Sequence, residues 1–170
     1  MKNQKNNDPE LYALFLDSVC DLYWAENHLV KVLPKMITSA SSKALKKALT
    51  NHLAETEMQV GRVERVFELL GEKAIAKKCD AMEGLTKEGE SIIETTPEGT
   101  LARDTGIILA SKKVEHYEIT SYAGAHQLAG KLGLEEVAAL LQETITEESN
   151  ASKLLSEIAE ATLGKATAKA

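Results

Sequence analysis

Apolar residues recur every three or four positions along four long segments of this chain. This spacing matches the turn of an α-helix, about 3.6 residues, so each segment predicts a long helix with one apolar face. The segments cover about residues 9–39, 42–70, 101–131 and 135–163. Alanine, leucine, glutamate and lysine dominate the sequence and are strong helix formers. We therefore expect an all-α fold.

The residues between these segments predict how the helices are connected. Asp8 and Pro9 are typical of a helix start, and Gly71 is typical of a helix end. The short breaks "SASS" and "LGLEE" predict two antiparallel helical hairpins. About 30 residues join the hairpins, with a short helix near residues 75–93 that two glycines interrupt and a loop at "TTPEGT". One long crossover of this kind is typical of a ferritin-like four-helix bundle.

Composition limits the class of protein. The 170 residues suffice for a single domain over residues 1–170, with a frayed tail expected at residues 164–170. A net charge of −6 argues against nucleic-acid binding, and no apolar run approaches the roughly 20 residues that span a bilayer. The polar start "MKNQKNNDPE" does not resemble a signal peptide. Cys20 and Cys79 lack a metal-binding CxxC spacing, so we expect reduced cysteines in a cytoplasmic protein without membrane partners.

Acidic residues interrupt the apolar face of every long helix near its middle. At a step of about 100° per residue, each face carries at least one carboxylate, and the second face also carries His52. A buried carboxylate is costly unless it is paired, and no lysine or arginine is visible on these faces. Two divalent metal ions would neutralise such a group. The predicted metal ligands are Glu26, His52, Glu55, Glu115, Glu118, Glu147 and Glu148, of which Glu55, Glu115 and Glu147 lie at the margins of their faces.

The two hairpins place these acidic residues in matching positions. Glu26 precedes Glu55 by 29 residues, and Glu118 precedes Glu147 by the same 29. A pseudo-two-fold bundle with shared metal ions predicts this correspondence. Taken alone, Glu26 could instead form a structural ion pair, and His52 could be a hydrogen-bonded core histidine.

Three tyrosines lie near the same apolar faces. The hydroxyl groups of Tyr23, Tyr117 and Tyr122 could donate hydrogen bonds to the ligand carboxylates, as groups around metal sites often do. Simple packing of the three rings is an equally good interpretation. The pattern assigns no catalytic residue.

Several stretches closely resemble the YciE/YciF-type ferritin-like proteins of bacteria. They are "LYWAENHLVKVLPKM", "HLAETEMQVGRVERVFELLGEKAIAKKCDAMEGL" and "KKVEHYEITSYAGAHQLAGKLG", and the likeness runs from about residue 10 to 160. The resemblance implies a rubrerythrin-like bundle with an additional short helix, usually dimeric and associated with stress responses. It also implies a di-iron or similar dinuclear carboxylate site.

The sequence departs from the better-known di-iron pattern. Rubrerythrins and ferritins carry Glu-x-x-His on two helices. Here Met58 follows Glu55 and Asn150 follows Glu147, so His52 is the only histidine expected to face inward. One metal ion would then have an all-oxygen shell, which suits manganese about as well as iron.

Two functions remain open from the sequence. The first is a dinuclear metalloprotein, with iron or manganese, that oxidises Fe(II) or consumes oxygen or hydrogen peroxide. The alternative is a non-catalytic structural or partner-binding stress protein whose metal site is vestigial or only stabilises the fold. The missing second histidine favours the alternative. We expect a homodimer in either case, formed through faces that carry residues such as Trp24 and Val30.

Overall fold

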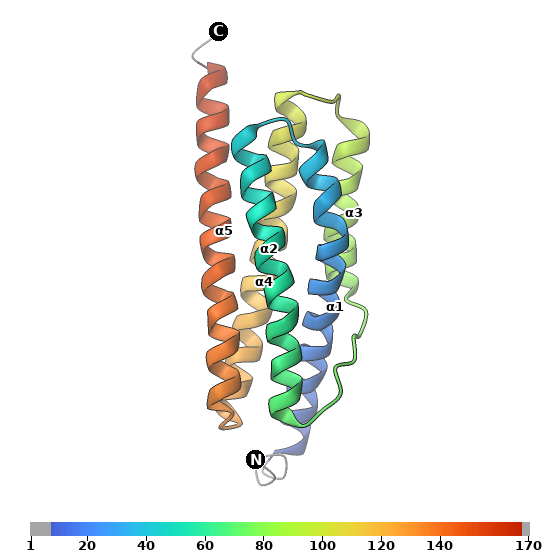
Figure 1. The fold of residues 1–170 in the computed structure, drawn as a ribbon, viewed down its shortest axis with the longest axis vertical. Helices are drawn as coiled ribbons and strands as arrows, with labels where there is room; N and C mark the ends of the chain where they lie inside the picture. Colours follow the sequence, from blue (N-terminus) through green and yellow to red (C-terminus); the bar gives the residue numbers. More distant parts are fainter. Residues whose placement is uncertain (1–7, 168–170) are drawn as a thin grey trace.

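The computed structural model describes residues 8–167, which form five helices and no strand (Figure 1). The predicted all-α, ferritin-like class is confirmed. None of the helices in this described range is long and apolar enough to cross a bilayer. The helices are α1 (Pro9–Ser39), α2 (Lys43–Leu70), α3 (Asp80–Thr95), α4 (Leu101–Lys131) and α5 (Glu135–Thr167).

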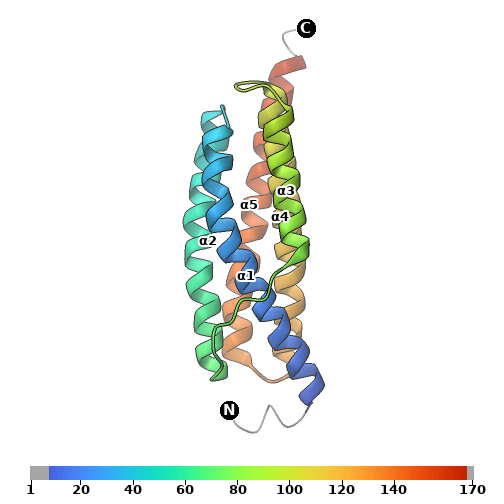
Figure 2. The same ribbon diagram turned by 90° about the vertical axis from the view of Figure 1, so that its right-hand side faces the viewer.

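Two helical hairpins and one crossover make the bundle. The hairpins are α1–α2 and α4–α5, and the crossover returns the chain to the end where α2 began, so α2 and α4 run in the same direction (Figures 1 and 2). Helix α3 belongs to this crossover and packs against α1 and α4 (Figure 2). It therefore covers one side of the bundle.

Local capping stabilises the starts of α1 and α2 and the end of α2. The Asp8 carboxylate accepts a hydrogen bond from the Leu11 amide at 3.0 Å, and the Ser42 hydroxyl accepts one from the Leu45 amide at 3.4 Å. Both bonds satisfy amides that an isolated helix start would leave unpaired. Gly71 ends α2 with a φ of 66°, a left-handed conformation that glycine adopts without steric cost.

The short helix starts later than the sequence predicts. Residues 72–79 are not helical but follow α1, where the Lys77 amide donates to the Cys20 carbonyl at 3.0 Å and the Lys77 ammonium lies 2.6 Å from Asp17. Helix α3 begins only after Cys79, whose thiol accepts a hydrogen bond from the Met82 amide at 3.3 Å. These tertiary contacts hold the first part of the expected helix in an extended form.

Two further features differ from the expectation. Helix α3 continues through both of its glycines, and Gly89 lies so close to α1 that an added Cβ would stand 2.6 Å from the Met36 methyl group. Helix α5 continues to Thr167, so residues 164–167 are helical rather than frayed. The rest of the expected tail lies outside the described residues.

Apolar side chains fill the bundle in two separate clusters. The upper core, toward the α1–α2 turn in Figure 1, includes Leu33 and Ile107. The lower core, toward the α4–α5 turn, includes Phe15 and Leu141. The interior between the two cores is polar, and this layer is where the sequence predicts a site.

Candidate metal centre

A layer of buried polar side chains separates the upper core from the lower core. On α1, Glu26 lies between Leu22 of the lower core and Leu29 of the upper core. The other long helices contribute at the same level, as expected when every helix carries its polar residue near its middle. We call these buried residues the polar layer: Glu26, His52, Gln59, Glu115, Glu118 and Glu148.

Four members of the polar layer converge on one point. His52 of α2, Glu115 and Glu118 of α4, and Glu148 of α5 each offer a ligand atom, and these atoms all lie within 4.8 Å of one another. All four residues are at most 5% exposed. Sequence reasoning named all four, including Glu115, which it placed at the margin of its face.

The converging atoms lack hydrogen-bond partners. Among the described residues, both carboxylate oxygens of Glu118, both ring nitrogens of His52 and one oxygen each of Glu115 and Glu148 are buried without a hydrogen bond. Buried polar atoms in native proteins are nearly always paired, because an unpaired one costs about 1–3 kcal/mol. A concentration of orphaned acceptors at one point is the pattern that a bound cation would satisfy.

Burial raises the pKa of three carboxyl groups in the polar layer. Loss of hydration raises the pKa of Glu26 from its ordinary value to about 8, with the negative charge of Glu148 adding to the effect and the Tyr122 hydrogen bond opposing it. Burial likewise raises the pKa of Glu115 and Glu118 well above 4.5, and the neighbouring Glu148 adds to both shifts. In the absence of a cation, Glu26, Glu115 and Glu118 therefore keep their protons to a higher pH than exposed glutamates do.

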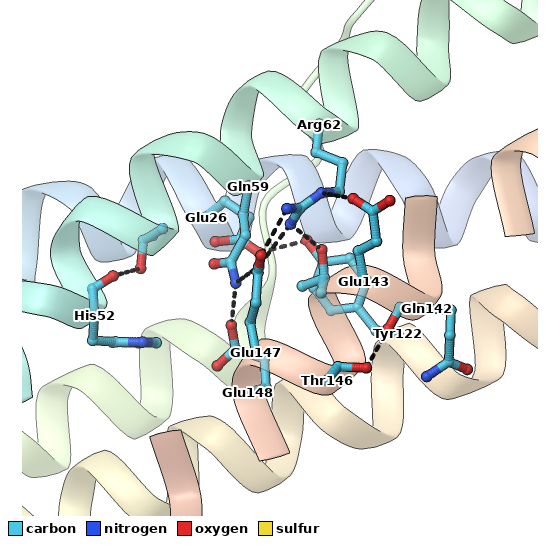
Figure 3. Close-up of polar contacts among 12 residues, drawn as sticks. Glu26, His52, Gln59, Arg62, Tyr122, Gln142, Glu143, Thr146, Glu147 and Glu148 are labelled. Atoms are coloured by element: carbon cyan, nitrogen blue, oxygen red, sulfur yellow. Dashed lines mark hydrogen bonds and ion pairs between the residues drawn. The ribbon is translucent and has the colours of Figure 1, made fainter. Parts of the chain in front are cut away.

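Glu26 approaches the cluster from α1 and is held by a tyrosine. The Tyr122 hydroxyl donates a short hydrogen bond to Oε1 of Glu26, while Oε2 has no partner (Figure 3). Tyr122 is buried, and its pKa is raised by that burial and by the charge of Glu26. The hydrogen bond fixes the Glu26 carboxylate and leaves its second oxygen available for a ligand.

Gln59 belongs to the layer, although sequence reasoning missed it. Its amide nitrogen donates to Glu148 at 2.5 Å and to Glu147 at 3.0 Å (Figure 3). Gln59 follows His52 by seven residues, two helical turns, so it lies on the same face of α2. This spacing from His52 could have identified Gln59 as an inward-facing residue from the sequence alone. The amide orients Glu148, the carboxylate that α5 contributes to the cluster.

Glu147 departs from the sequence expectation because an arginine pairs with it. Arg62 makes two hydrogen bonds to the Glu147 carboxylate, at 2.7 and 2.8 Å, and also reaches Glu143 at 3.3 Å (Figure 3). Burial would raise the pKa of Glu147, but hydrogen bonds from Arg62 and Gln59 outweigh it and lower the pKa. The expectation of no cation near the acidic residues was wrong here, because the long arginine side chain reaches inward from the helix margin.

Glu55 lies beside the converging cluster rather than within it. It is half-buried and lines a cavity of about 150 Å³ between α2 and α5, together with Glu147, Asn51 and Asn150. His52 and Glu115 also line this cavity. An acidic and amide-lined opening therefore leads from the surface to the polar layer.

Two of the three tyrosines do not reach the polar layer. The Tyr23 hydroxyl donates to Glu64 at 2.7 Å in an exposed position, and Tyr117 donates to Asp21 at 2.7 Å. The Tyr117 hydroxyl also lies 2.9 Å from the sulfur of Cys79. Both rings leave their helices beside the apolar face rather than within it, so only Tyr122 is placed to bond a layer carboxylate.

The arrangement fits a cation better than any internal pairing. One imidazole and several carboxylates are the donors that iron, manganese and zinc accept. His52, Glu115, Glu118 and Glu148 could hold one ion. Glu26 and Glu55 lie outside this group of four. Glu147 is already engaged by Arg62. The donor set is rich in oxygen and contains a single nitrogen ligand, as the sequence predicts.

Comparisons with known proteins identify the family of this chain. Residues 10–168 match the family described as "Domain of unknown function (DUF892)". Protein YciF of Escherichia coli K12 is 39% identical over 147 residues, which cover 86% of this chain and 88% of that protein.

Solved structures show the same architecture. The crystal structure of the E. coli stress protein YciF matches with a TM-score of 0.87 and 37% identity, over 91% of this chain and 98% of that chain. YcfI of Rhodopseudomonas palustris, for which a structural role has been suggested, matches with a TM-score of 0.83 and 34% identity, over 89% and 96% of the two chains. The chain therefore belongs to the DUF892 family of YciF-type proteins.

Proposed function

We propose that the polar layer binds two divalent metal ions, iron or manganese, and that the protein oxidises Fe(II) with oxygen or peroxide during stress. The observation that carries this proposal is the group of orphaned buried atoms. Among the described residues, Thr105 is the only residue outside the polar layer that has a buried side-chain oxygen or nitrogen without a hydrogen bond. Such a layer is costly without a cation and favourable with one.

Bound metal ions would supply the electrons, and the solvent would supply the protons, because the layer carboxyls release theirs as the cations bind. Two Fe(II) ions would each lose one electron, and dioxygen would accept two electrons and two protons to become hydrogen peroxide. With hydrogen peroxide as the oxidant, the same two electrons and two protons would yield two water molecules.

The side chains of the layer have separate tasks in this proposal. Glu118 and Glu148 would bind cations through oxygens that have no other partner. Tyr122 would keep Glu26 oriented, and Gln59 would do the same for Glu148. Carboxyl groups with raised pKa values would release their protons as cations bind, so that metal uptake acidifies the solution. The apolar cores above and below would keep bulk water out.

A structural role is the second candidate. The Arg62–Glu147 pair removes one predicted ligand, and His52 is the only imidazole in the layer. In this case the metal ions would stabilise the bundle without turnover. A structural role has also been suggested for YcfI of R. palustris, which is similar to this chain.

One experiment separates the two candidates. Anaerobic titration of the metal-free protein with Fe(II) measures stoichiometry, and stopped-flow mixing with oxygen or peroxide then measures oxidation. Tight binding followed by oxidation faster than that of free Fe(II) supports the proposed enzyme. Tight binding without turnover supports the structural role, and the absence of binding contradicts both.

The expected homodimer and cytoplasmic location remain part of this proposal. Trp24 is partly covered already, since it packs against the upper core and stacks on His28 with ring centroids 4.5 Å apart. A dimer interface would therefore use the remaining exposed part of this face. Light scattering of the purified protein measures the mass directly.

A further inference from the structure

A second cavity reaches the polar layer from a different side of the bundle. It lies between α1, α3 and α4, has a volume of about 20 Å³, and is lined in part by His52 and Glu115. That volume is close to the space that one water molecule needs. The acidic cavity between α2 and α5 touches the same two residues. The candidate metal site thus has two approaches.

Hydrocarbon side chains form most of the wall of this second cavity. Leu33, Met36 and Val114 are buried around it, and Val32 and Leu85 are half-buried. His52 and Glu115 are the charged or ionisable residues of the lining, and the rest of the wall offers a water molecule few polar partners.

The one buried hydroxyl of the wall is already engaged. The Thr86 hydroxyl donates to the Met82 carbonyl at 3.0 Å and lies 2.9 Å from the His28 ring nitrogen. It therefore has little hydrogen-bonding capacity left for a polar guest. Ser111 is half-buried and is the other hydroxyl along this wall.

We propose that the apolar cavity between α1, α3 and α4 is the approach for dioxygen, whereas metal ions enter through the acidic cavity between α2 and α5. This inference rests on the proposed function. Moving an unpaired hydroxyl into an apolar site costs about 1–3 kcal/mol by protein data, so hydrogen peroxide is disfavoured there. Dioxygen has no hydrogen bonds to lose. A hydrated cation, in contrast, needs a carboxylate, and Glu55 lines the other approach.

Nuclear magnetic resonance under oxygen pressure tests the cavity without any turnover. Dissolved dioxygen is paramagnetic and speeds the relaxation of methyl groups that it contacts. In the zinc-loaded protein, we expect a several-fold greater enhancement at Leu33, Met36 and Val114 than at Leu70 and Leu132. The last two lie in the lower core and have a similar exposure, each 7%. Equal enhancement at both sets would overturn the proposal.

Two matched substitutions separate the two approaches. Ser111→Leu places a larger apolar side chain in the wall of the α1–α3–α4 cavity, and Ala151→Leu does the same in the acidic cavity. Ser111→Leu should reduce the methyl enhancement and slow oxidation several-fold with unchanged zinc uptake. Ala151→Leu should slow zinc uptake and leave the methyl enhancement unchanged. The reverse pattern, or no difference between the two variants, contradicts the assignment.

Zinc calorimetry distinguishes a failure of this inference from a failure of the proposed function. If zinc does not bind the wild-type protein, the metal proposal fails. If zinc binds and the methyl relaxation is uniform, only the dioxygen route is excluded and the metal proposal stands.

Discussion

His52 of α2 and Glu115 of α4 meet in the interior of the bundle, with Nε2 of the imidazole 3.5 Å from Oε1 of the carboxylate. This distance is too long for a good hydrogen bond. Two donor atoms bound tetrahedrally to one metal ion, each at about 2.1 Å, would lie roughly 3.4 Å apart. The pair is therefore spaced as two ligands of a shared ion would be.

Replacing Glu118 tests the layer most selectively. Glu118→Gln keeps the shape and removes the charge, so we expect the loss of at least one bound ion per chain with unchanged helicity. The metal-free variant should be more stable than the wild type at high pH, by about 1 kcal/mol or more, because the buried charge is gone. Metal analysis and thermal unfolding measure both effects. The exposed Glu57→Gln on α2 is the control, and equal metal content in the two variants would remove Glu118 from the ligand set.

The metal-free protein should lose stability as the pH rises. Glu26 has a folded-state pKa of about 8 against an ordinary value of 4.5, so the folded state holds a proton that the unfolded state has released between these values. The stabilising contribution is complete below 4.5 and decreases by up to about 1.4 kcal/mol per pH unit up to the raised pKa. The pKa values of Glu115 and Glu118 are also raised, so these two groups add to the loss of stability with rising pH.

Urea unfolding between pH 5 and pH 9 measures this profile. Bound metal ions should reverse the slope, because binding requires the deprotonated carboxylates. Glu147 affects stability in a different pH range. Because its pKa is lowered in the folded state, the stability that it contributes is lost only as the pH falls into the acid range. A metal-free protein whose stability is constant from pH 5 to pH 9 would show that the layer carboxyls are not buried as described.

Breaking the Arg62–Glu147 pair should affect stability more than metal binding. Arg62→Met removes two hydrogen bonds to Glu147 and one to Thr144, and we expect a loss of about 1–3 kcal/mol near neutral pH. Metal stoichiometry should be unchanged, because Arg62 holds a carboxylate outside the converging cluster. Adding Glu147→Gln should recover part of the lost stability in a double-mutant cycle. Loss of all bound metal in Arg62→Met would instead place this pair within the site.

Asp104 is a buried carboxylate outside the candidate metal centre, so its replacement should affect stability and not metal binding. This buried residue near the start of α4 accepts hydrogen bonds from the Ser41 amide and hydroxyl, each at 2.7 Å, and from the Ser42 amide at 2.9 Å. It therefore holds the α1–α2 turn. Asp104→Ala should lower the free energy of unfolding by about 2–4 kcal/mol, because three charge-assisted bonds are lost. Calorimetry should show the lower stability together with unchanged metal stoichiometry, and a change in stoichiometry would contradict this separation.

The sequence pattern predicted the helices because their apolar faces are long and regular. Glu26, His52 and Glu148 could be placed in the interior for the same reason, since each lies within an apolar face. The start of α3 could not be predicted in this way. It depends on the Lys77–Cys20 hydrogen bond, which joins residues far apart in the chain.

Tertiary contacts also explain which parts of the site were missed. Arg62 lies at the edge of its helix face, and only the packed bundle shows that its guanidinium reaches Glu147. Glu115 lies at a similar margin and is nevertheless buried, in a wall that Thr86 of α3 shares. A helical wheel places Arg62 and Glu115 at equivalent margins of their helix faces. Only the packing of neighbouring helices determines which of the two side chains is fully buried.

Anomalous diffraction at the iron and manganese absorption edges tests the central claim most directly. Crystals grown with each metal should show anomalous density within bonding distance of Glu118 and His52, in the layer between the upper and lower cores. A second peak near Glu26 or Glu55 would establish a dinuclear site. The absence of density in this layer, or density only at exposed acidic side chains, would contradict the account.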